Sequence, residues 1–197
     1  MEGHPGRQDQ VLTTRSQGAS PPAPSQDDLT ESFEPIVGQS VVLRPLQRAD
    51  IDIEGSFLRG LSPESRHNRL LGGMIQITPE YLERLTTVDY SRDMALAAAL
   101  MLDEREVLIG VARFVREESG RGCEFALVIA DQWQGRGIGR RMLEKLLAAA
   151  RSRGLERIYG DVLSTNEHML GLCRKLGFTL GRVPGDPTVT RVTLALP

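Results

Sequence analysis

Two spacings of apolar residues alternate along this chain, and each change of spacing marks the boundary of a predicted element. Residues 41–46, with the sequence VVLRPL, predict a strand, and a helical pattern begins at Asp50. Ser62 and Thr78 are each followed by proline and glutamate, a combination typical of a helix N-cap with proline in the first turn. We therefore predict three helices between this strand and the next apolar run.

The middle of the chain predicts a sheet. Residues 94–102 are continuously apolar, which is typical of a strand buried on both faces. Residues 107–115 alternate between two faces, and residues 123–130 predict a further strand. The alternation assigns Leu108, Ala112 and Phe114 to one face and Ile109, Val111 and Val115 to the other.

The last third of the chain returns to a mixture of helix and strand. In order, we predict an amphipathic helix, a strand, a second helix and two short strands, at residues 139–153, 157–163, 164–177, 178–182 and 188–196. Gly154 is the expected C-cap of the first helix, and Ser164 with Glu167 matches a capping box for the second. The order β-α-α-α-β-β-β-α-β-α-β-β places the chain in the α/β (α+β) class.

The first 35 residues differ in composition from the remainder. They are rich in glycine, proline, serine and glutamine, and such a segment buries too little apolar surface to offset the entropy of ordering it. We expect a disordered tail over residues 1–35 and one domain over residues 36–197.

Composition excludes several classes of function. A net charge of −2 gives no broad basic field for nucleic acid. The two cysteines, Cys123 and Cys173, are too few for a disulfide scaffold and lack metal-ligand spacing, so we expect no metal. The longest apolar run is too short to span a membrane and the N-terminus has no apolar leader, so we expect a cytoplasmic protein.

The most informative segment is the glycine-rich stretch 131–140, DQWQGRGIGR, which follows a predicted strand and opens a helix. Unpaired N–H groups at a helix N-terminus form a site for phosphate, and glycine lets a ligand approach the backbone closely. The spacing fits neither the dinucleotide fingerprint G-x-G-x-x-G nor a P-loop. A glycine-rich turn that only packs against a helix remains the structural alternative.

The pattern Gln134-x-x-Gly137-x-Gly139 resembles the acetyl-CoA signature of the GNAT acetyltransferases. The resemblance continues in the segments 166–170 and 176–178 and in the order of elements from residue 41 to 196. Segments such as Leu43-Arg44-Pro45 and Glu124-Phe125-Ala126 are most similar to the acetyltransferase domain of bacterial protein-lysine acetyltransferases. The resemblance implies the GNAT fold: a mixed, mostly antiparallel sheet of six to seven strands, with splayed central strands and helices on both faces.

The resemblance also implies a site for acetyl-CoA as co-substrate. The pantetheine arm is expected between two splayed strands, and the pyrophosphate is expected on the glycine-rich turn. The cofactor-binding residues carried over in this way are Leu127, Val128, Ile129, Gln134, Gly135, Arg136, Gly137, Ile138, Gly139, Arg140, Asn166 and Met169.

Glu124 matches the catalytic glutamate of the family. An amine acceptor is almost wholly protonated at neutral pH and needs a base, and a carboxylate among apolar neighbours has its pKa raised toward a useful range. The alternative is a solvated charge paired with Arg113 or Arg121. Many GNAT enzymes carry an acid tyrosine on the last helix; Cys173 takes that position here, either as a thiol donor or as a small buried residue.

The resemblance thus implies an N-acetyltransferase, with the side-chain amine of protein lysines as the leading acceptor and a homodimer as one assembly it allows. A small amine as acceptor and a non-catalytic acetyl-CoA-binding module both stay open. The helix that follows Ser62 is expected at the acceptor entrance. There Ser62, Glu64, Ser65 and Arg69 contact the acceptor or only cap and solvate that helix.

Overall fold

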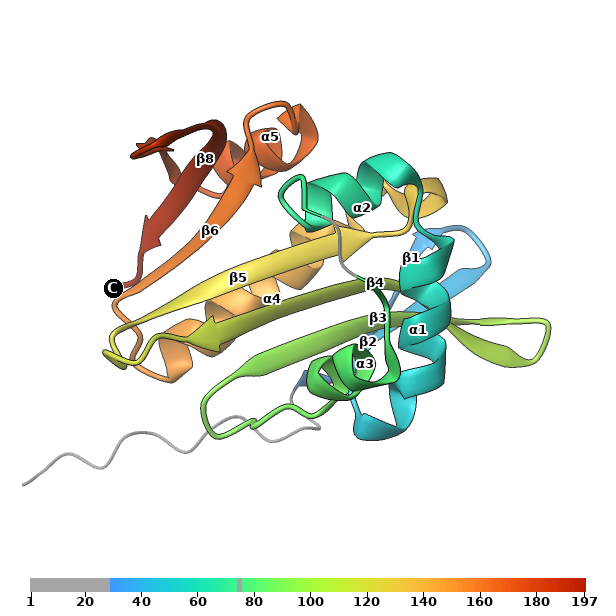
Figure 1. Cartoon of the computed structure of the whole chain (residues 1–197). Helices are drawn as coiled ribbons and strands as arrows, with labels where there is room; N and C mark the ends of the chain where they lie inside the picture. Colours follow the sequence, from blue (N-terminus) through green and yellow to red (C-terminus); the bar gives the residue numbers. More distant parts are fainter. Residues whose placement is uncertain (1–28, 74–75) are drawn as a thin grey trace, which may run out of the picture.

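The computed structural model describes residues 29–73 and 76–197, and within them the chain forms one mixed sheet flanked by helices (Figure 1). The eight strands are ordered β1-β2-β3-β4-β5-β6-β8-β7, and all neighbours are antiparallel except β5 and β6. The strands are β1 (Glu31–Ile36), β2 (Gln39–Pro45), β3 (Met94–Leu102), β4 (Arg105–Arg116), β5 (Gly122–Ile129), β6 (Arg157–Leu163), β7 (Thr179–Val183) and β8 (Asp186–Ala195).

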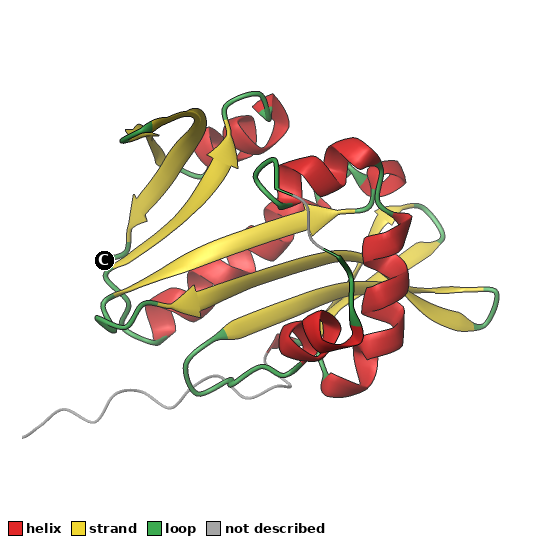
Figure 2. Ribbon diagram, viewed as in Figure 1, coloured by secondary structure: helices red, strands yellow, loops and turns green. Residues whose placement is uncertain are grey.

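Helices cover both faces of this sheet (Figure 2). They are α1 (Ile51–Gly60), α2 (Pro63–Arg69), α3 (Pro79–Thr86), α4 (Ile138–Ser152) and α5 (Glu167–Lys175), with short 3-10 turns η2 (Arg48–Asp50) and η3 (Asp131–Trp133). Figure 1 shows α1, α2 and α3 on the near face, and α4 on the far face. Each face has its own apolar core, so the sheet separates two packed layers. Among the described residues, no helix combines the length and apolar character that crossing a membrane requires.

The helix starts follow the capping chemistry of the sequence. Ser62 Oγ accepts a hydrogen bond from the N–H of Ser65 at 3.1 Å, and Thr78 Oγ1 accepts one from the N–H of Tyr81 at 3.2 Å. The predicted start of α5 is wrong by two residues. Asn166, and not Ser164, is its N-cap, because Asn166 Oδ1 accepts from the N–H of Met169 at 3.1 Å.

The first strand corrects two predictions. The predicted tail covered residues 1–35, but residues 31–36 form β1, which pairs antiparallel with β2, and Leu29 is buried in the core, so the described part of that prediction is wrong. Residues 1–28 lie outside the described residues. The sheet therefore has eight strands and not six to seven. The apolar pattern did not predict this strand, because Pro35 and two glutamates interrupt the alternation of apolar and polar residues. Proline and charged residues are typical of an edge strand.

A β-bulge corrects the predicted faces of β4. Ala98 pairs with Gly110, whereas Ala99 pairs with Leu108, so Ile109 is the extra residue. Ile109 therefore joins Ala112 and Phe114 in the core beneath α4, and Leu108 lies with Val111 in the opposite core. A strict period of two cannot reveal such an insertion, since the bulge shifts the faces by one residue.

Candidate active site

The site begins where β5 and β6 separate. Their parallel pairing covers only three residue pairs and ends at Glu124 opposite Tyr159. Just beyond, the ring of Phe125 packs on Gly160, and a Cβ at Gly160 would lie 2.7 Å from Cε1 of Phe125. Because an aromatic ring occupies this space, it acts as a wedge between the strands. Beyond the wedge the sheet opens into a cleft with a volume of about 690 Å³.

Most of the residues predicted to bind acetyl-CoA line this cleft. They are Leu127, Val128, Ile129, Gln134, Gly135, Gly137, Gly139, Arg140, Asn166 and Met169. Two predicted residues do not line it. The side chain of Ile138 is buried in the core, and Arg136 lines a separate groove beside β1, where its guanidinium stacks over the Trp133 ring at 5.1 Å.

One wall of the cleft presents backbone groups of β5. The N–H of Ala130 donates to the carbonyl of Ile109 on β4, at 2.8 Å. Backbone direction alternates along a strand, so the groups of Leu127 and Ile129 point away from β4 and toward the gap. The carbonyl of Ile129 accepts from the side-chain amide of Gln134 at 3.0 Å, which fits this direction. A ligand can therefore pair with this strand edge.

The glycine-rich turn closes one end of the cleft. Gly135 and Gly137 adopt φ of 72° and 80°, a region that side chains disfavour, and Gly137 is the N-cap of α4. The first backbone hydrogen bond of α4 runs from the N–H of Arg141 to the carbonyl of Gly137, at 3.1 Å. The N–H groups of residues 138–140 precede that bond, so they lie at the positive end of the helix. This arrangement suits a pyrophosphate.

A hydrogen-bond network joins the turn to α2. The carboxylate of Asp131 accepts from the N–H of Ser62 at 3.0 Å and from the hydroxyls of Ser62 and Ser65 at 2.6 and 2.8 Å. These bonds hold the pKa of Asp131 below its usual value despite partial desolvation. Gln134 Nε2 also donates to Ser65 Oγ, at 3.1 Å. The polar side chains of Ser62 and Ser65 are therefore used to fix α2, while Arg69 at the end of α2 lines the cleft.

Glu124 lies exposed at the wedge and lines the cleft. Neither of its two expected partners binds it, because Arg113 pairs with the buried Glu54, at 3.1 Å, and Arg121 makes no side-chain ion pair among the described residues. Within the described part of the chain, the Glu124 carboxylate itself has no ion pair or hydrogen-bond donor. Partial removal from water raises its pKa, the negative charge of Asp161 adds to this, and Arg191 and Arg69 oppose it.

Cys173 is a core residue. Its side chain is fully buried, and burial raises the pKa of its thiol to about 12. A thiol that is shielded from the cleft cannot reach a leaving group there, so the structure favours the small buried residue over the proton donor. Cys123 is equally buried and its thiol pKa is likewise raised to about 12.

The family assignment agrees with this geometry. The family model described as "Acetyltransferase (GNAT) family" matches residues 73–178, which include the wedge, the glycine-rich turn and most of the residues that line the cleft. The chain belongs to the GNAT acetyltransferase family.

This GNAT domain is similar in sequence and structure to several bacterial acetyltransferases. The acetyltransferase PA5475 of Pseudomonas aeruginosa is 35% identical over 81% of this chain and 86% of its own length. The acetyltransferase Pat of Mycolicibacterium smegmatis is 29% identical over 71% of this chain, which spans only 41% of that protein. The GNAT domain of S. lividans PAT superposes with a TM-score of 0.73 and 26% identity, covering 85% of this chain and 97% of that one. The sheet and its helices are therefore a GNAT fold.

Three residues of this GNAT site were missed from the sequence. Asp131 begins the glycine-rich stretch, and a carboxylate just after a strand and before a turn is a local signal for capping contacts. Asp161 and Arg191 lie far apart in the chain. Only the register of β6 with β8 brings them together, and no local pattern encodes that register.

Proposed function

We propose that this protein transfers the acetyl group of acetyl-CoA to a primary amine, namely the side-chain amine of lysines in proteins. The transfer occurs by direct attack in a ternary complex, with Glu124 as general base. One observation carries the proposal: Glu124 is an exposed carboxylate without a partner among the described residues, at the point where the cofactor cleft opens between β5 and β6.

The cleft offers a complementary contact to each part of acetyl-CoA. The N–H groups at the start of α4, with Arg140 beside them, suit the pyrophosphate. The edge of β5 at Leu127 and Ile129 suits the amide-bearing pantetheine arm, and Asn166 and Met169 line the opposite side from α5. Acetyl-CoA supplies an acetyl thioester, the activated acyl group.

Glu124 would make the acceptor nucleophilic. An alkylammonium has no free electron pair, so its proton must pass to a base before nitrogen can attack the thioester carbon. A carboxylate with a raised pKa retains that proton better than an ordinary glutamate does, which favours the transfer. A backbone N–H on the edge of β5 would stabilise the negative charge that develops on the carbonyl oxygen.

The surroundings of Glu124 favour a large acceptor. Among the residues that the structure describes, Figure 1 shows no helix in front of β6 and β8, so they leave this side of the sheet uncovered next to the wedge. Val115, the β4 neighbour of Glu124, is 52% exposed, which is unusual for a valine in the centre of a sheet. A lysine on a protein surface can approach an open face of this kind, whereas a small amine gains most from an enclosed pocket.

A panel of acceptors tests this assignment. Release of the coenzyme A thiol is measured with a lysine-containing peptide, a polyamine and a free amino acid, for the wild type and for Glu124→Gln. The proposal predicts the highest kcat/KM with the peptide, and loss of that activity in the variant. Higher kcat/KM with the polyamine or the amino acid would assign a small acceptor. Acetyl-CoA binding without turnover on any acceptor would indicate a non-catalytic module.

A further inference from the structure

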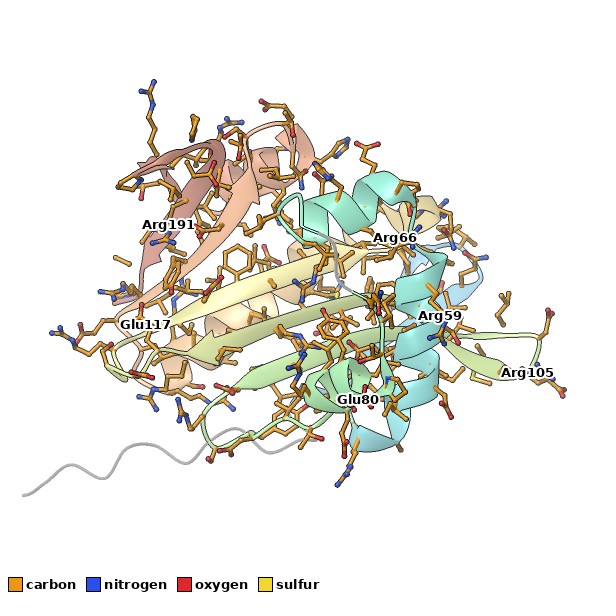
Figure 3. The ribbon with its side chains drawn as sticks, in the orientation of Figure 1. Arg59, Arg66, Glu80, Arg105, Glu117 and Arg191 are labelled. Carbon is orange, nitrogen blue, oxygen red and sulfur yellow. The ribbon has the colours of Figure 1, made fainter. Side chains whose placement is uncertain are left out.

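The ion pair between Arg191 and Asp161 lies on the uncovered face of the sheet, beside Glu124. Arg191 on β8 donates from Nε and from a terminal nitrogen to the two carboxylate oxygens of Asp161 on β6, both at 2.7 Å. The Arg191 guanidinium also lies over the ring of Tyr159, 4.8 Å from its centre. Figure 3 shows Arg191 in front of the sheet, close to β6. Two parallel hydrogen bonds fix the orientation of the Asp161 carboxylate.

This pair shares its face with the proposed base. Glu124 is opposite Tyr159 in the register of β5 and β6, and Asp161 follows Tyr159 by two residues, so these side chains project from the same face. Glu124 and Asp161 both line the cleft. Asp161 lies just beyond the wedge, on the side where the strands have separated.

The charges around Glu124 come from three neighbouring elements. Asp161 on β6 and Arg191 on β8 act on it in opposite directions, and Arg69 from α2 adds a further positive charge. Tyr159 on β6 contributes a neutral phenol with a raised pKa, and the β4 neighbour Val115 carries no charge. Among the described residues, Asp161 is therefore the one other carboxylate that acts on Glu124, and its negative charge is partly balanced by Arg191.

We propose that Asp161, held by Arg191, is a further acceptor-binding residue: the ammonium group of the acceptor binds between the carboxylates of Asp161 and Glu124 before Glu124 takes its proton. This inference rests on the proposed function. The proton moves from the ammonium nitrogen to a Glu124 oxygen, while Asp161 stays ionised. Arg191 donates one hydrogen bond to each Asp161 oxygen, so each oxygen can still accept a further hydrogen bond, and Asp161 lines the cleft.

Two neutralising variants with opposite electrostatic effects test this role. Asp161→Asn removes a negative charge and leaves Arg191 without its partner, so the pKa of Glu124 falls. The acidic limb of the pH profile of kcat/KM then moves to lower pH. Arg191→Met leaves Asp161 unbalanced, so the limb moves to higher pH. We expect shifts of about half a pH unit, matching half-exposed charge pairs. Asp161→Asn also raises the KM for a lysine peptide roughly twofold to fivefold, with a smaller change in kcat.

The matched control is Glu83→Gln, which breaks the exposed ion pair of Glu83 with Arg48. This variant should change neither the pH of the acidic limb nor the KM for the peptide. If both variants lose activity but their acidic limbs do not shift in opposite directions, the Asp161–Arg191 pair has only a structural role and the inference is overturned. Glu124→Gln separates this failure from failure of the proposed function. If Glu124→Gln loses turnover while the limb stays fixed in Asp161→Asn, only the role of Asp161 is wrong; if Glu124→Gln keeps full turnover, the proposed base is wrong.

Discussion

At the scale of single residues, the proposed chemistry depends on one carboxylate, Glu124, that has no ion pair or hydrogen-bond donor among the described residues. Two arginines that could neutralise Glu124 are paired elsewhere: Arg113 with Glu54, and Arg191 with Asp161. Glu124 alternates with inward-facing Cys123 and Phe125, so it projects from the core toward the uncovered face. The proposed base therefore borders both the cleft and the solvent, from which the proposed protein acceptor would approach.

Replacement of Glu124 by glutamine removes the base while retaining its size. We expect Glu124→Gln to bind acetyl-CoA with an unchanged Kd and to lose at least roughly tenfold in kcat near neutral pH, at the low end of general-base effects. Calorimetric titration measures the binding and coenzyme A release measures the turnover. Glu124→Asp, which keeps a carboxylate, is the control and should retain more activity than glutamine.

The pH profile of the wild type gives an independent check. The pKa of Glu124 is raised, so Glu124 is protonated and inactive as a base below that raised pKa. The acidic limb of kcat/KM should therefore lie above the ordinary glutamate value of about 4.3 and should disappear from the residual activity of Glu124→Gln. A limb that persists unchanged in the glutamine variant would belong to another group.

At the scale of elements, the glycine-rich turn and helix α2 are joined through the carboxylate of Asp131. Asp131 holds the start of α2 by three hydrogen bonds, and Gln134 of the turn reaches the same helix through Ser65. The position of α2 over the cleft is therefore set by the segment that follows β5.

Removal of the Asp131 carboxylate should loosen α2 more than the cofactor site. We predict that Asp131→Ala raises the KM for the acceptor several-fold, leaves the Kd for acetyl-CoA within about twofold, and costs about 1 kcal/mol of folding free energy. Asp89→Ala is the control. It removes a similar carboxylate that accepts from the N–H and hydroxyl of Ser91 but does not line the cleft. Equal losses of affinity for both substrates would show that Asp131 acts on the cofactor turn itself.

The wedge between β5 and β6 gives a second test at this scale. A methyl group at Gly160 would lie 2.7 to 3.0 Å from three atoms of the Phe125 ring, which also packs against Phe178. Gly160→Ala should therefore cost about 1–3 kcal/mol in stability, through overpacking, and weaken acetyl-CoA binding as the ring shifts. Gly60→Ala, where an added Cβ meets nothing within 4 Å, should leave both nearly unchanged. Thermal unfolding and calorimetric binding distinguish the two variants.

Local patterns predicted most of these elements and the glycine-rich turn, because caps, apolar runs and glycines act over a few residues. Strand β3 was predicted with the bounds that the structure gives, and the N-caps Ser62 and Thr78 are confirmed. The bulge at Ile109 and the Asp161–Arg191 pair could not be predicted in this way. Both depend on the pairing register of neighbouring strands, and packing across the whole sheet determines that register.

At the scale of the whole molecule, β1 at the edge of the sheet is held against α4. Glu31 pairs with Arg141 and with Lys145, the latter at 3.0 Å, and the Arg141 guanidinium lies 4.6 Å from the centre of the Phe33 ring. Leu29, just before the strand, is buried in the core beneath α4. The segment before residue 37 therefore supports the helix whose N-terminus faces the cleft.

Two truncations separate the role of β1 from that of the residues before it. A chain that begins at residue 29 keeps all of these contacts, and we expect its Tm to stay near that of the full chain. A chain that begins at residue 37 loses the burial of Leu29 together with the strand pairing, and its Tm should fall by at least roughly 4 °C. Equal Tm values for the two truncations would show that β1 contributes little to stability.

The most direct test of the central claim is mass spectrometry of a deacetylated protein extract incubated with acetyl-CoA and either the wild type or Glu124→Gln. We predict new acetyl-lysine on a limited set of proteins with the wild type, and its loss with the variant. The same acetyl-lysine with both proteins, or none with a wild type that binds acetyl-CoA, would contradict a lysine acetyltransferase that uses Glu124 as its base.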